Sequence, residues 1–128
     1  MQIKLNSILV DDQAKALAFY TEILGFVKKQ DIPAGEFRWL TVISPEGPED
    51  VELVLEPNAN AAARSYQQAL HQQGIPLTAF SVTDVHQAFE NLKQKGVLFH
   101  SEPMDLGAVI IAVLDDTCGN LIQIYQQK

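Results

Sequence analysis

The sequence contains a single cysteine, Cys118, and no apolar run that approaches the roughly 20 residues of a transmembrane helix. One cysteine excludes an internal disulfide, which suits a reducing compartment. The N-terminus lacks a charged segment followed by an apolar one, so no secretory signal is visible. These absences predict a cytoplasmic protein that has no membrane partner.

Positive charge is also scarce. Nine lysines and arginines stand against 16 aspartates and glutamates, which gives a formal net charge of −7. An acidic surface repels phosphate backbones and anionic lipids, so we expect no nucleic-acid partner. A neutral or cationic small molecule meets a more favourable field.

What is present indicates one globular domain over residues 1–128, because 47% of the residues are hydrophobic and the length suits a single core. Asp11 and Asp12 can cap a helix, Leu17 and Tyr20 lie on one apolar helical face, and Gly25 can end it. Strand-like patterns occupy residues 3–10, 37–43, 51–55, 75–82, 109–114 and 121–125.

The two halves of the chain repeat each other. Val10-Asp11-Asp12 is followed 72 residues later by Val82-Thr83-Asp84, and Glu52 precedes Gln123 by 71 residues. Each half is predicted to hold one helix and about four strands, within residues 1–57 and 75–128, and residues 58–74 connect them. Neither half can bury both faces of its own sheet. The pattern therefore predicts an α+β fold of two similar modules.

Three sets of segments show a family resemblance. They are Leu9-Val10-Asp11-Asp12 with residues 18–26 (AFYTEILGF), residues 80–84 (FSVTD) with 92–97 (LKQKGV), and residues 114–123 (LDDTCGNLIQ). In this order the sequence resembles the glyoxalase/bleomycin-resistance/extradiol dioxygenase (vicinal oxygen chelate) superfamily over nearly the whole chain. The resemblance implies tandem βαβββ modules, an open cupped mixed sheet that holds a small ligand, and a homodimer.

Metal-dependent members of this family use four ligands, usually His, Glu, His and Glu, to bind a divalent ion. The resemblance places these positions on Leu5, Glu52, Leu77 and Gln123. Leucine has no lone pair and glutamine is a weak ligand, so we expect no metal and no other cofactor. The three histidines, His71, His86 and His100, show no ligand spacing and are expected at the surface.

The family register turns Glu52 and Gln123 into the cup. Glu52 can bind a cation, act as a general base if burial raises its pKa, or form an internal hydrogen bond to Gln123 or Asn6. Trp39 can stack on a ligand or pack in the core or a dimer interface. The candidate ligand-binding residues are Phe37, Trp39, Glu52, Phe80, Gln123 and Tyr125.

Three functions agree with the sequence. The first is metal-independent binding of a small cationic or aromatic molecule in the cup. The second is a glyoxalase-type lyase or dioxygenase-like enzyme with an atypical site. The third is a non-catalytic module whose own side chains fill the cup.

Overall fold

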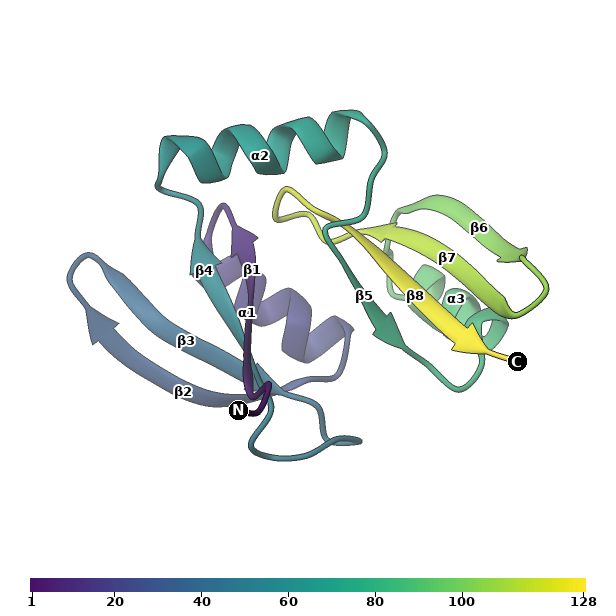
Figure 1. Ribbon diagram of the computed structural model, residues 1–128, viewed down its shortest axis with the longest axis horizontal. Coiled ribbons are helices and arrows are strands. Elements are labelled where there is room, and N and C mark those ends of the chain that lie inside the picture. The colour runs from purple at the N-terminus through teal and green to yellow at the C-terminus, as the bar shows by residue number, and fades with distance from the viewer. The chain divides into compact units, whose positions relative to one another are not determined.

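The computed structural model describes all 128 residues, which divide into two compact units, Met1–Arg64 and Ser65–Lys128 (Figure 1). Each unit contains one four-stranded mixed sheet and follows a βαβββ order. The predicted α+β fold of two βαβββ modules is therefore confirmed.

The first sheet has the strand order β1-β4-β3-β2, in which β1 is parallel to β4 and the other neighbours are antiparallel. A helical segment connects β1 to β2, and it changes from α-helical to π-helical hydrogen bonding at Phe19. The elements are β1 (Leu5–Val10), α1 (Gln13–Ala18), η1 (Phe19–Ile23), β2 (Val27–Ala34), β3 (Phe37–Ile43) and β4 (Glu52–Pro57).

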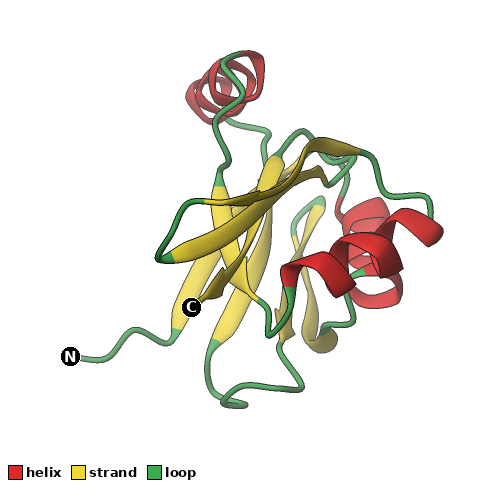
Figure 2. Ribbon diagram, turned by 90° about the vertical axis from the view of Figure 1, so that its right-hand side faces the viewer, coloured by secondary structure: helices red, strands yellow, loops and turns green.

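The second sheet has the corresponding order β5-β8-β7-β6, with β5 parallel to β8. Figure 2 distinguishes its strands in yellow from the helices in red. Its elements are β5 (Thr78–Ser81), α3 (Val85–Gln94), β6 (Phe99–Asp105), β7 (Val109–Asp115) and β8 (Leu121–Gln127). Between the two modules, the predicted connector forms the helix α2 (Ala61–Gln72).

The same capping chemistry begins and ends the helix of each module. The Asp12 carboxylate accepts from the Lys15 backbone N–H at 3.0 Å, and Asp84 accepts from that of Gln87 at 3.0 Å. Gly25 and Gly96 end the helical segments at φ +85° and +87°, where a Cβ would introduce strain. The cap predicted at Asp12 and the helix end predicted at Gly25 are confirmed.

Each helix covers one face of its own sheet. In the first module Leu40, Leu55 and Val10 are fully buried on the face that α1 covers, together with Ala16 of the helix. In the second module Leu114 and Ile122 are buried in the equivalent way beneath α3. Each fully buried aliphatic side chain contributes about 1.5–3 kcal/mol to the stability of the fold. The opposite face of each sheet is not covered by the helix of its module.

A buried amide fastens α1 to its sheet. Gln13 Nε2 donates to the carbonyls of Arg38 at 2.7 Å and Leu55 at 2.9 Å, and Gln13 Oε1 accepts from Arg38 N at 3.0 Å. The second module reverses the direction, because Gln126 of β8 accepts from the backbone N–H of Val85 in α3 at 3.0 Å.

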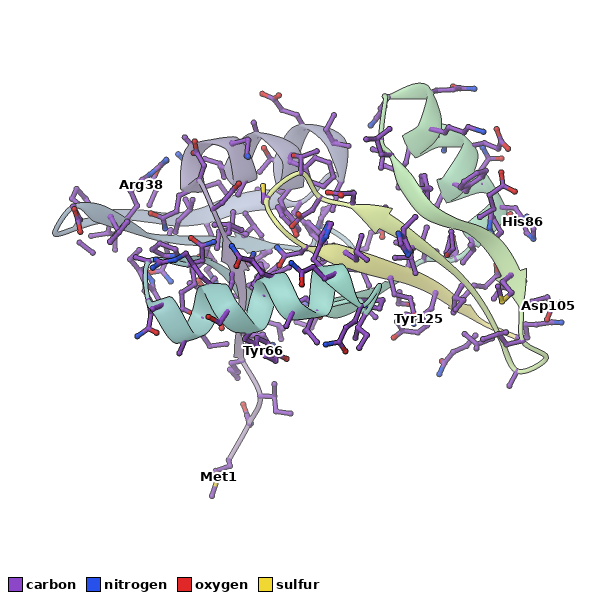
Figure 3. The ribbon with its side chains drawn as sticks, turned by 90° about the horizontal axis from the view of Figure 1, so that it is seen from above. Met1, Arg38, Tyr66, His86, Asp105 and Tyr125 are labelled. Atoms are coloured by element: carbon purple, nitrogen blue, oxygen red, sulfur yellow. The ribbon has the colours of Figure 1, made fainter.

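Sequence patterns did not locate the edge strands β2 and β6. Both are mostly exposed and contain a proline, Pro33 or Pro103, so neither shows the apolar alternation of a half-buried strand. An ion pair spans the β2–β3 hairpin, where Arg38 (Figure 3) donates to both Asp31 oxygens at 2.9 and 2.7 Å. Arg38 lowers the pKa of Asp31 to about 2.

The β7–β8 turn is held by a buried polar network. Asp116 accepts from the backbone N–H groups of Cys118 at 2.7 Å and Asn120 at 3.0 Å, and from Asn120 Nδ2 at 2.7 Å. Gln67 of α2 donates to Asn120 Oδ1 at 2.9 Å and to the Cys118 carbonyl at 3.3 Å. This network fixes α2 on the turn, and Cys118 is buried within it.

None of the helices is both long and apolar enough to cross a membrane.

Candidate functional site

The face of the first sheet that α1 does not cover collects the polar and aromatic groups. Alternation along β3 places Phe37, Trp39 and Thr41 on this face, and the register pairs Thr41 with Val54 of β4. Glu52, two residues before Val54, lies on the same face beside Leu5 of β1. Arg38 lies on the other face. Three of the candidate ligand-binding residues, Phe37, Trp39 and Glu52, are thus on one surface.

A β-bulge in β2 directs a side chain toward Glu52. The β2–β3 pairing shifts between Lys28 and Gln30, which places Gln30 opposite Thr41. Thr41 Oγ1 accepts from the Gln30 backbone N–H at 3.2 Å. The Gln30 side chain then reaches Glu52. No sequence pattern pointed to Gln30 or Thr41, because the contact depends on the bulge.

Glu52 is held as an anion. Its Oε1 accepts from Gln30 Nε2 at 2.6 Å and from Thr41 Oγ1 at 2.7 Å. These two donors lower the pKa of Glu52, with a smaller contribution from the charge of Lys29. A general base that works near neutral pH needs the opposite shift. Both partners belong to strands of the first module, and Asn6, one of the partners considered from the sequence, is not among them. Glu52 Oε2 accepts no hydrogen bond.

A shallow pocket of about 180 Å³ lies beside Glu52 on the same sheet. Trp39 is 38% exposed there, and neither its indole N–H nor the Glu56 carboxylate has a hydrogen-bond or ion-pair partner. The volume is below the roughly 300–1,000 Å³ of drug-sized sites, so the pocket suits a fragment or the end of a larger ligand. Its lining residues are Leu5, Asn6, Ser7, Trp39, Val54 and Glu56.

The remaining candidates lie on the second sheet and do not share a face. Gln123 pairs with Ala79 and Val113, and Tyr125 pairs with Ser81 two residues along the same strand. These side chains point to the face that α3 leaves uncovered. Phe80 pairs with Ile124 and points to the opposite face, on the side of α3. The structure therefore separates Phe80 from Gln123 and Tyr125.

The residues at the family's metal positions do not fit a divalent cation. Leu5 is the strand partner of Glu52, and the strand partner of Gln123 is Ala79, because Leu77 lies just before β5. Neither apolar side chain offers a lone pair. No group of three or more His, Cys, Asp or Glu side chains could hold a metal ion elsewhere. The histidines, including His86 (Figure 3), are exposed and dispersed.

The fold and the open sheet face define a class of protein. The model of the Glyoxalase/Bleomycin resistance protein/Dioxygenase superfamily matches residues 2–124, and the chain belongs to this superfamily. The sequence is 53% identical to the "uncharacterized protein YurT" of Bacillus subtilis over 99% of this chain and 100% of that protein. It is 28% identical to the lactoylglutathione lyase of Salmonella typhimurium, over 100% of this chain and 94% of the enzyme.

Solved structures show the same fold. The crystal structure of UcmS2 has a TM-score of 0.85 at 31% identity and covers 99% of this chain and 98% of its own. TnmS3, described as an antibiotic-binding protein from Streptomyces sp. CB03234, has a TM-score of 0.75 at 26% identity, with coverages of 100% and 97%. The relatives thus include both a binding protein and lyases.

Proposed function

We propose that the protein binds a small cationic or aromatic molecule without a metal, on the face of the first sheet that α1 leaves uncovered. The observation that supports this most directly is Glu52. Two donors saturate its Oε1 and keep the carboxylate ionised, while Oε2 is available to a donor on the ligand. Such a fixed acceptor needs little reorganisation when a ligand arrives.

Aromatic surface lies beside this acceptor. Phe37 and Trp39 are each 38% exposed on the same face of β3, so a ligand can reach both rings. A flat ligand that stacks on these rings can direct an N–H or O–H group at Glu52. The antibiotic-binding description of TnmS3 supports binding as the function, and the missing donors at Leu5 and Ala79 support metal independence.

The test is calorimetric titration of metal-stripped protein with a panel of aromatic amines, neutral aromatics and aromatic acids. We expect at least one amine or neutral aromatic to bind in the presence of a chelator. Trp39→Ala should weaken that binding by roughly tenfold, since one stacked aromatic contributes about 1.4 kcal/mol. Tyr66→Ala is the matched control, because Tyr66 is exposed on α2 (Figure 3) and lies outside the sheet.

A lyase is the second candidate, since lactoylglutathione lyases align over the whole chain. If binding appears only after nickel, cobalt or zinc is added, or if the loaded protein turns over the hemithioacetal of glutathione, the metal-independent proposal is wrong. Glu52→Gln would then abolish metal binding as well. The homodimer and the cytoplasmic location stay predictions, and sedimentation of the purified protein tests the first of them.

A further inference from the structure

The pocket beside Glu52 contains a second carboxylate, Glu56, which the family resemblance does not assign. Glu56 follows Glu52 by two strand repeats on β4, so both side chains lie on the same face. Trp39 of β3 lines the same pocket as Glu56 and lies on the same face of the sheet.

Three features of this pocket point to positive charge on the ligand. Glu56 has no hydrogen bond or ion pair, whereas Asp31 pairs with Arg38 and Asp50 pairs with Lys4 in the same module. The exposed ring of Trp39 offers a π-face next to this carboxylate. None of the six lining residues is basic, so no protein cation neutralises Glu56 within the pocket.

We propose that Glu56 and Trp39 select an organic cation, with the charged nitrogen of the ligand on the Trp39 ring and beside the Glu56 carboxylate. A cation in this position gains a cation–π interaction and an ion pair at once. A neutral aromatic gains only the stacking, and an aromatic acid is repelled by Glu56. This inference rests on the proposed function and narrows its ligand to one charge class.

The chain has a built-in probe for this site, because Trp39 is its only tryptophan. Selective excitation of tryptophan therefore reports on this pocket alone. The first ligand is benzyltrimethylammonium, and the comparison ligand is neopentylbenzene, which has the same shape without the charge. We expect the cation to change the Trp39 emission saturably and to bind more tightly than the neutral compound.

The decisive variant is Glu56→Gln, which removes the charge and keeps the size. An exposed ion pair contributes up to about 1 kcal/mol, so the affinity for the cation should fall by roughly threefold while that for neopentylbenzene is unchanged. Glu90→Gln on α3 is the matched control, since it makes the same change of net charge at an exposed site of the second module. It should leave both affinities unchanged.

Each outcome separates the two proposals. Equal binding of both ligands, with no effect of Glu56→Gln, overturns the charge selection and leaves small-molecule binding intact. An equal loss in Glu56→Gln and Glu90→Gln also overturns it, because the general charge of the protein would then explain the selectivity. If benzyltrimethylammonium does not bind, the inference is wrong, and if no member of the calorimetric panel binds either, the proposed function fails with it.

Discussion

The two modules share a scaffold and differ in what they place on the uncovered sheet face. Both use an aspartate N-cap, a positive-φ glycine and the same strand order. At the bulge of the edge strand, however, Gln30 and Thr41 face each other in the first module, whereas Ser101 and Val113 do so in the second. Valine cannot donate a hydrogen bond, so Gln123 beside Val113 lacks the kind of support that holds Glu52.

This difference shows that the repeat preserves backbone chemistry more strictly than side-chain chemistry. Caps and turn glycines satisfy requirements of the chain itself, so each module must keep them. The uncovered faces have no such requirement. The first module has the ionised Glu52 on this face, and the second module has the neutral amide of Gln123 beside Val113. Substitutions of the buried polar side chains that differ between the modules should therefore cause the largest losses of stability.

The largest expected effect concerns the β7–β8 turn of the second module, which contains the buried polar network around Asp116. Asp116→Ala removes the acceptor of three buried hydrogen bonds and should lower the free energy of unfolding by roughly 3–4 kcal/mol. Urea denaturation measures this loss. Asp115→Ala, at the neighbouring and half-buried position, should cost about 1 kcal/mol. Equal losses in the two variants would contradict the role of the network.

The helix fastenings provide a smaller and more direct comparison. Gln13→Ala leaves three backbone groups of β3 and β4 without their partner, and it should cost about 2 kcal/mol. Gln126→Ala leaves only the Val85 N–H, and it should cost about 1 kcal/mol. Hydrogen exchange on each variant should show the loosening in the altered module. A larger loss for Gln126→Ala would reverse our ranking of the two fastenings.

Much of the fold could be predicted because it depends on local chemistry. The strand at Phe37–Ile43 matches the prediction residue for residue, since its β-branched and aromatic run is unambiguous. β2 was not located, because an exposed edge strand has no apolar alternation. The hydrogen-bond partners of Glu52 depend on a bulge in that same strand. The position of Phe80 depends on strand pairing in the second module, where Ala79 rather than Leu77 lies beside Gln123.

The smallest effect tests the difference between the sheet faces themselves. Thr41→Val gives the first module the residue type that the second has at its bulge, and it removes one donor to Glu52. The pKa of Glu52 should rise from its lowered value toward the ordinary 4.5, while Gln30 still lowers it in part. Carboxyl NMR titration measures this change. The loss of stability at neutral pH should be about 1 kcal/mol.

The sign of the pH dependence follows from the same pKa. A carboxyl whose pKa is lower in the folded state stabilises the fold above its unfolded pKa, and this stabilisation is lost as the pH falls through the folded value. The pKa of Glu52 is lowered less in Thr41→Val, so ionised Glu52 contributes less stability to this variant. Its unfolding free energy should therefore depend less on pH in the acid range than that of the native protein. Thr78→Val, on a strand of the second module, should leave the titration of Glu52 unchanged. If Thr41→Val also leaves the titration of Glu52 unchanged, Gln30 alone lowers the pKa of this carboxyl. The β2 bulge that positions Gln30 would then account for the difference between the two sheet faces.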